Sequence, residues 1–166
     1  PMIDGGGQEW DLRAGTENTP AIVGLATALQ IAETNRSDYV ERCTFMRDQL
    51  IEGILSRTPH AWLNGPRTKR LPNNVNLSFS NIDSDSLLLL LDQEGICASS
   101  GSACTSGSIN PSHVLLALGL APDRVASAIR LTVGKAVTNE NINFVLEIFP
   151  NVIGKLRDLS AYINPS

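Results

Sequence analysis

The stretch Pro72-Asn73-Asn74-Val75-Asn76-Leu77-Ser78-Phe79 alternates between polar and apolar side chains over its last six residues. Successive side chains of a β-strand point to opposite faces of a sheet, so this alternation is typical of a strand with one buried face. The stretch therefore predicts a half-buried strand that the chain enters from Pro72.

Two further strands are predicted on either side of the segment that contains Cys104. Residues 129–133 alternate in the same way, with Arg130 and Thr132 opposite a hydrophobic face. Residues 96–98 fit a short strand that leads into the Cys104 segment. The sequence thus predicts three strands.

Helices are predicted from capping residues and from apolar side chains at helical spacing. The helix over residues 21–33 has small or aliphatic side chains on nearly all sides, so we expect it to be buried, and Pro150 is expected to kink or split the last helix. The predicted helices cover residues 21–33, 38–54, 84–93, 111–118, a brief segment from 122, and 139–159. Strands and helices in this order indicate an α+β or α/β domain whose helices cover a small sheet.

The composition and charge of the chain argue against nucleic-acid-binding and membrane proteins. The chain has 166 residues, 42% of them hydrophobic, which is enough for a real core, and a net charge of −4 with scattered basic residues argues against nucleic-acid binding. No apolar run is long enough to span a membrane, and no signal pattern opens the chain, so we expect a cytoplasmic protein with no membrane contact. Three cysteines without a CxxC pattern favour free thiols.

Cys104 stands in Ser100-Gly101-Ser102-Ala103-Cys104-Thr105-Ser106-Gly107, a segment without a large side chain. Such surroundings suit an exposed, reactive thiol, and the two glycines are candidate hinges. A surface thiol of no consequence is the alternative. Cys43, by contrast, falls on the apolar stripe of a helix and is expected in the core.

Other candidate residues follow from single features. Arg130 on a strand needs a carboxylate partner, either structural or on a ligand. Residues 13–18 precede a helix, where backbone amides and the Thr16 hydroxyl can meet a phosphate. His113 could be a proton donor or a metal ligand, but a packing residue is favoured, and the basic cluster 67–70 is expected to be a solvated loop.

The sequence resembles the cysteine desulfurases of the NifS/IscS kind, which belong to the class V aminotransferases. The matching blocks are Gly5-Gly6-Gly7-Gln8-Glu9 with residues 12–18, the segment 99–107, and Ser112-His113-Val114. These blocks run through nearly the whole chain in the family's order. The resemblance implies the C-terminal part of a fold-type-I PLP-dependent transferase, with a small, mainly antiparallel three-stranded sheet covered by helices.

The resemblance also implies a reaction. A family member uses pyridoxal 5'-phosphate (PLP) to remove sulfur from L-cysteine, which leaves L-alanine and an enzyme persulfide that serves iron–sulfur cluster assembly. Cys104 matches the family's nucleophile and is a possible transient iron–sulfur ligand. Arg130 matches the arginine that holds the substrate carboxylate, and Thr16 matches a threonine that reaches the PLP phosphate of the neighbouring subunit in a homodimer.

One departure from the family is large. The lysine that holds PLP follows a histidine in relatives, whereas none of the lysines of this chain, Lys69, Lys135 and Lys155, does so. We therefore expect the anchoring lysine in a missing N-terminal part of the enzyme, and the isolated chain to be inactive. The alternative is a non-catalytic sulfur carrier or a module that docks a scaffold protein.

The resemblance assigns residues 1–34 to the end of the large PLP domain and the interdomain helix, and residues 35–166 to the small C-terminal domain. It implies as partners L-cysteine, an iron–sulfur scaffold or other sulfur acceptor protein, and a second subunit. Cys97 stands where relatives have a small aliphatic residue, and it is expected in a buried strand, with a Cys97–Cys104 redox pair as the less favoured alternative. Metal binding by Cys104 with Cys97 or His113 has only weak spacing support.

Overall fold

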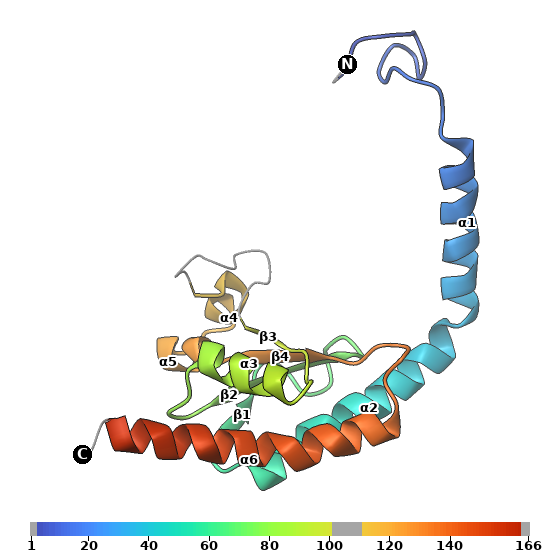
Figure 1. The fold of residues 1–166 in the computed structure, drawn as a ribbon. Coiled ribbons are helices and arrows are strands. Elements are labelled where there is room, and N and C mark those ends of the chain that lie inside the picture. Colours follow the sequence, from blue (N-terminus) through green and yellow to red (C-terminus); the bar gives the residue numbers. More distant parts are fainter. Residues whose placement is uncertain (1–2, 101–110, 164–166) are drawn as a thin grey trace. The chain divides into compact units, whose positions relative to one another are not determined.

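The computed structural model describes residues 3–100 and 111–163, and side chains up to residue 160. Contacts within the chain divide it into two compact units, Pro1–Asp38 and Tyr39–Ser166. Figure 1 gives the order of the helices and strands. No helix in the described ranges is both long and apolar enough to cross a membrane.

The first unit consists of an irregular segment followed by α1 (Thr19–Thr34). Asn18 caps this helix, since its Oδ1 accepts a hydrogen bond of 3.1 Å from the Ala21 amide, and Pro20 lies in the first turn. The predicted helix over residues 21–33 is confirmed, and these capping features explain why it begins at Thr19. The expected burial is wrong, however, because the described chain buries no residue of α1. Its aliphatic side chains are exposed instead, among them Ile22, Leu25 and Leu29.

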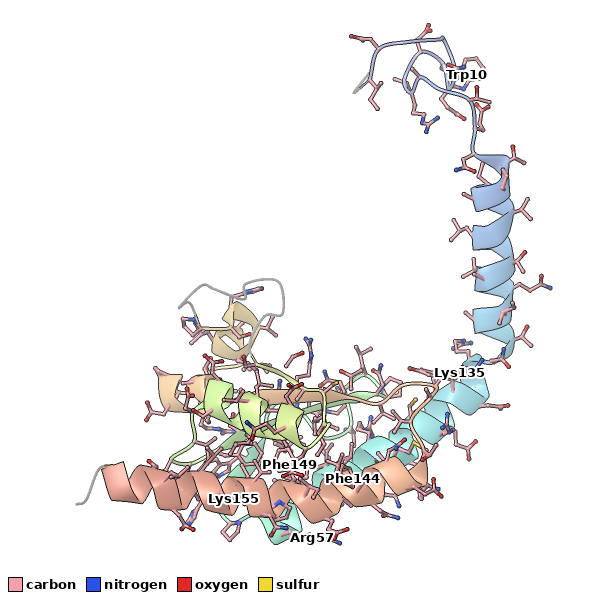
Figure 2. The ribbon with its side chains drawn as sticks, in the orientation of Figure 1. Trp10, Arg57, Lys135, Phe144, Phe149 and Lys155 are labelled. Carbon is pink, nitrogen blue, oxygen red and sulfur yellow. The ribbon has the colours of Figure 1, made fainter. Side chains whose placement is uncertain are left out.

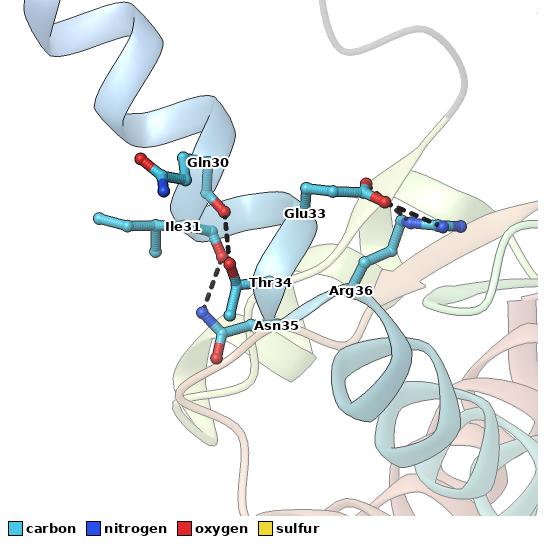
Figure 3. A network of polar contacts seen from close by, with 6 residues as sticks. All are labelled: Gln30, Ile31, Glu33, Thr34, Asn35 and Arg36. Carbon is cyan, nitrogen blue, oxygen red and sulfur yellow. Dashed lines mark hydrogen bonds and ion pairs between the residues drawn. The ribbon is translucent and has the colours of Figure 1, made fainter.

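The C-terminal end of α1 is closed by side chains that bond within one turn (Figure 3). Thr34 Oγ1 donates to the Gln30 carbonyl at 2.9 Å, and Asn35 donates to the Ile31 carbonyl through both its backbone amide and Nδ2. The Arg36 guanidinium also forms a bidentate ion pair with the Glu33 carboxylate. Helix ends leave carbonyls without partners, so these bonds explain why α1 ends at this point.

The remaining elements follow in chain order. They are α2 (Arg36–Arg57), β1 (Ala61–Leu63), β2 (Asn74–Phe79), α3 (Ser84–Gln93), β3 (Ser99–Ser100), α4 (His113–Ala117), α5 (Pro122–Ala126), β4 (Ile129–Thr132) and α6 (Asn139–Ile163). The predicted helices are all present, and α6 runs through Pro150 as one continuous helix, so the proline does not split it.

Four strands of the described residues form one antiparallel sheet in the order β1-β2-β4-β3. The expected antiparallel sheet is confirmed, but the expected number of strands, three, is wrong. The additional strand is Ala61–Leu63, whose three residues are too few to show a period in the sequence. The strand predicted at 96–98 lies instead at Ser99–Ser100, because Ile96 still belongs to the turn that caps the C-terminus of α3.

The end of α3 shows why β3 begins late. Gly95 takes a φ of +75°, its amide donates to the Asp92 carbonyl at 2.9 Å, and the Ile96 amide donates to the Leu91 carbonyl at 2.8 Å. This pair of bonds is the Schellman motif, in which a hydrophobic contact accompanies the turn. Leu91 and Ile96 are accordingly both buried.

The hydrophobic core lies on one face of the sheet, against α2, α3 and α6. The apolar residues of β2, Val75, Leu77 and Phe79, are at most 1% exposed, and Phe79 meets Phe149 of α6 with ring centroids 5.5 Å apart. Figure 2 labels Phe149 together with Phe144, a second phenylalanine of α6 that is 45% exposed. Cys43 is fully buried in this core, as predicted.

The opposite face of the sheet is polar and carries the two short helices. Asn74, Asn76 and Ser78 of β2 point to this side, since side chains alternate along a strand. The Ser78 hydroxyl donates to the Arg124 carbonyl of α5 at 2.5 Å. A small second cluster of apolar residues, Leu115, Val125 and Ala128, holds α4 and α5 together.

Candidate functional site

A cavity of about 280 Å³ lies on the polar face of the sheet. Its wall combines the turn after β1, the strands β2 and β4, and α4 with its N-cap residue. The polar lining residues are Asn64, Arg70, Asn74, Asn76, Ser112 and Arg130. No aspartate or glutamate among the described residues lines it, so two guanidinium groups face a cavity without a counter-charge. Such a cavity suits an anionic ligand.

Arg130 is half-buried in β4, between Asn76 of β2 and Ser99 of β3 in the strand register. Within the described part of the chain, no carboxylate lies within ion-pair distance of its guanidinium and no hydrogen bond fixes it. Of the two partners weighed for this residue, a structural carboxylate is therefore not found in the described ranges. Arg130 lines the cavity, and nothing in the described ranges pairs with its guanidinium.

Arg70 is the second guanidinium of the cavity, and it is held by backbone carbonyls. Its Nε donates to the Pro66 carbonyl at 3.0 Å, and its Nη2 donates to the carbonyl of Asn64. Its Nη1 is buried without a partner in the described residues. Burial, followed by the positive charge of Arg47, lowers the pKa of Arg70. An anion in the cavity would accept a hydrogen bond from Nη1, and its negative charge would favour the protonated form of Arg70.

A hydrogen-bonded network lies beneath the cavity, around the buried side chain of Asn64. Arg124 Nη2 donates to Asn64 Oδ1 at 2.8 Å. Asn64 Nδ2 in turn donates to Asn76 Oδ1 at 2.8 Å and to the Ser78 hydroxyl at 2.7 Å. The Arg124 guanidinium also lies over the ring of Trp62, 5.5 Å from its centroid. The network therefore fixes the polar floor of the cavity.

The three predicted site residues fall in different parts of the chain. Arg130 lies in the cavity, whereas Thr16 is exposed in the first unit, three residues before α1. Cys104 falls outside the described residues. The segment around Thr16 is shaped by Gln8, whose Oε1 accepts from the Gly15 amide at 3.2 Å, and the Thr16 hydroxyl is open to solvent.

Two other expectations are wrong. Cys97 is exposed and not part of a strand, because the chain is still leaving the α3 cap at this point. His113 is exposed at the start of α4, so it is not a packing residue; Leu115 fills the adjacent core instead. Within the described ranges, no group of three or more histidine, cysteine or acidic side chains could hold a metal ion.

Some residues that complete the cavity are not among those predicted from the sequence. The basic cluster 67–70 was expected to be solvated. This expectation is correct for Arg67, which is exposed and paired with Glu52, but it is wrong for Arg70, which is half-buried. Asn64 lies at the end of a strand that was not predicted. Asn76 is visible as a polar residue in an alternating strand, but its neighbour across the sheet depends on strand order.

The family profile described as class-V aminotransferase matches residues 4–145. The cysteine desulfurase IscS of Clostridium botulinum (strain Hall) is 47% identical over 161 residues, which are 96% of this chain and 41% of that protein. The protein of the same name from Dictyoglomus turgidum is 43% identical over 162 residues, which are 98% of this chain and again 41% of that protein. The chain thus spans about two-fifths of the curated relatives that it matches.

Solved structures agree with these sequence relatives. A structure described as a NifS-like protein superposes with a TM-score of 0.78 at 33% identity, over 93% of this chain and 39% of that one. The NifS-like protein from Rickettsia africae ESF-5 gives a TM-score of 0.76 at 31% identity, over 93% of this chain and 40% of that one. With most of its length matched by the family profile, the chain belongs to the class-V aminotransferase family.

Proposed function

We propose that this chain is the C-terminal part of a cysteine desulfurase. The whole enzyme would remove sulfur from L-cysteine, release L-alanine and carry the sulfur as a persulfide on Cys104 for iron–sulfur cluster assembly. Support comes from the relatives named cysteine desulfurase, which are 43–47% identical to almost the whole chain.

The observation that carries the proposal is the donor-lined cavity around Arg130. The α-carboxylate of an amino acid needs a planar pair of N–H donors, and a guanidinium that has no carboxylate partner among the described residues provides them. A half-buried position strengthens the pairing, because water screens it less than on an open surface. Arg130 would therefore hold the carboxylate of L-cysteine and so orient its sulfur.

Cys104 would act as nucleophile and sulfur carrier. Its thiolate would attack the substrate sulfur, form the new S–S bond and take the sulfur while the Cβ–S bond breaks, and Cβ would gain a proton. L-cysteine and one thiol then give L-alanine and one persulfide, so no outside oxidant is needed. Support for this role comes from the residues around Cys104 in the sequence.

PLP is the cofactor that this proposal requires, and when bound it supplies the electron sink for breaking the carbon–sulfur bond. The described residues supply only some of the groups that would bind PLP. Lys69, Lys135 and Lys155 are all exposed, and none lines the cavity, so none is placed to hold the cofactor. The exposed hydroxyl of Thr16 can donate to the phosphate, near the N-terminus of α1. The anchoring lysine would then lie outside this chain.

We further propose the domain boundary and the assembly implied by the family. Residues 1–34 would belong to the large domain and residues 35–166 to the small one, and Thr16 would serve the neighbouring subunit of a homodimer. The exposed aliphatic side chains of α1, such as Leu25 and Leu29, support this division, since a packed large domain would remove them from water.

The partners and location follow from the same function. The persulfide would pass to an iron–sulfur scaffold or another sulfur acceptor protein, and Cys104 could ligate iron transiently during transfer. A cytoplasmic location suits the free thiols. The alternative, a sulfur carrier or docking module without its own catalysis, is kept because the chain supplies no cofactor lysine in its cavity.

The test is persulfide trapping in the full-length protein. After incubation with L-cysteine, alkylation and mass spectrometry should find the persulfide on the peptide of Cys104, with alanine formed in parallel. Cys104→Ala should abolish the persulfide, whereas the matched control Cys97→Ala should keep it. A persulfide that survives Cys104→Ala would overturn the assignment. Sulfur on Cys104 without any alanine production would favour the carrier alternative.

A further inference from the structure

Four residues form one polar row across the sheet. Asn76 of β2 lies opposite Arg130 of β4, and Arg130 lies opposite Ser99 of β3. On the other side, the Asn64 amide donates to the Asn76 carbonyl at 2.9 Å and so continues the register just beyond β1. Side chains directly opposite each other share a face and lie about 5 Å apart at Cβ. The Asn76 side chain is therefore the immediate neighbour of the Arg130 side chain on this face of the sheet.

The orientation of the Asn64 side-chain amide is set by Arg124. A guanidinium carries only donors, so the atom of Asn64 that faces it at 2.8 Å must be the oxygen. The Asn64 nitrogen then points the other way, toward Asn76 and Ser78. The hydroxyl of Ser78 accepts this bond and donates its own hydrogen to the Arg124 carbonyl. Asn64 is 2% exposed, so water cannot substitute for these partners.

The orientation of the Asn76 amide follows from that of Asn64. The Asn64 nitrogen at 2.8 Å requires an acceptor, so Asn76 must turn its oxygen toward Asn64. The Asn76 nitrogen is left on the far side, where the described residues provide no acceptor for it. Asn76 and Arg130 both line the cavity from opposite positions on neighbouring strands, so one ligand can reach both side chains.

We propose that Asn76 Nδ2 is a second donor to the carboxylate held by Arg130, and that Asn64 and Arg124 are positioning residues that keep this nitrogen turned to the cavity. The inference rests on the proposed carboxylate role of Arg130. A carboxylate can accept from both groups at once through its two oxygens, whereas a neutral amide or alcohol has fewer acceptor positions. The amide thus adds selectivity for an acid.

The first experiment measures carboxylate binding without catalysis. Sodium acetate is titrated into the 166-residue chain, with sodium chloride at the same ionic strength as the reference, and the side-chain amide and guanidinium resonances are followed by NMR. We expect saturable shifts at Asn76 Nδ2 and Arg130 Nε. Asn76→Ala should weaken acetate binding about tenfold, the factor that about 1.4 kcal/mol gives. Thr132→Ala, an exposed position two residues from Arg130 on the same face, should leave binding unchanged.

A second variant tests the direction of the amides. Asn64→Asp keeps the oxygen that accepts from Arg124 but replaces the donor that faces Asn76 with an acceptor. The Asn76 amide should then turn over and present its oxygen to the cavity, with a loss of acetate affinity similar to that of Asn76→Ala. In the double variant the losses should not add, because both act through one nitrogen. Fully additive losses would mean that the carboxylate introduced by Asn64→Asp repels acetate directly, and would contradict the positioning role.

Kinetics of the full-length enzyme give an independent readout. Asn76→Ala and Asn64→Asp should raise KM for L-cysteine about tenfold with little change in kcat, as expected for a lost ground-state contact. If acetate shifts Arg130 but not Asn76, the inference fails and the carboxylate role of Arg130 stands. If neither residue responds to acetate, both fail. An effect of Asn76→Ala on kcat alone would also overturn the inference.

Discussion

Asn76 and Arg130 lie directly opposite each other on neighbouring antiparallel strands, 54 residues apart in the sequence. Both strands bury their apolar residues on one side, and this pair occupies the other side, next to the cavity. The alternation that builds the core thus also presents the site. A one-residue slip in register would move Arg130 into the core, so the packing of the core fixes the position of the site.

Replacing Arg130 by lysine tests the need for a planar fork. Arg130→Lys keeps the positive charge but loses the paired N–H donors, so KM for L-cysteine should rise by about 10- to 100-fold. Steady-state kinetics of the full-length enzyme measure this change. Arg36→Lys, at an exposed pair with Glu33, is the control and should change KM by less than about twofold. An Arg130→Lys enzyme with normal KM would argue against carboxylate binding at this residue.

The core face of α6 should dominate stability. Phe149 is fully buried against Phe79, so Phe149→Ala should lower the free energy of unfolding by about 3–5 kcal/mol. Phe144 is on the same helix but is 45% exposed, and Phe144→Ala should cost less than about 1.5 kcal/mol. Urea denaturation followed by circular dichroism separates the two. Equal losses would mean that α6 packs with a different face.

Two helical glycines should respond differently to replacement by alanine. Gly154 in α6 has open space where a Cβ would go, so Gly154→Ala should stabilise the protein by about 0.5–1 kcal/mol through the lower entropy of the unfolded chain. A Cβ on Gly53 of α2 would overlap the Leu146 side chain, and Gly53→Ala should therefore give no gain or a loss. Thermal unfolding of both variants checks the sign. A gain at Gly53 equal to that at Gly154 would contradict the close approach of α2 and α6.

The thiols should differ sharply in accessibility. Cys97 is exposed and Cys43 is fully buried, so in a Cys104→Ala background iodoacetamide should label Cys97 in the native protein and Cys43 only after unfolding. Peptide mass spectrometry at timed intervals measures both sites. Rapid native labelling of Cys43 would show that α2 leaves the core readily. Protection of Cys97 in the intact enzyme, but not in this chain, would place it at a contact made by the rest of that enzyme.

Much of the fold could be predicted because its signals are local. Asn18 and Asp83 are residue types that favour helix N-caps, and both are N-caps in the structure, with Asp83 Oδ2 accepting from the Ser86 amide at 2.8 Å. The alternation around Val75 placed the longest strand. The sequence did not predict β1, because three residues are too few to show the alternation of a strand. It wrongly predicted a strand at Cys97, because the turn that caps α3 continues up to this residue.

Only part of the candidate site could be predicted from the sequence. Arg130 could be singled out because a charge in a strand needs a partner, and the ordered motifs indicated the family. Arg70 and Asn64 could not, since one looks like part of a solvated basic cluster and the other like a turn residue. Both line the cavity together with residues of α4 and β2, which the chain reaches only later.

The sequence by itself determined the helices, the main strands, the family and the thiol at position 104, because capping, periodicity and motif spacing are properties of neighbouring residues. Only the tertiary structure decided which amide lies beside Arg130 and which way that amide faces. Strand order and register bring Asn64, Asn76 and Arg124 together from distant parts of the chain, and the donor-only guanidinium of Arg124 then orients both amides.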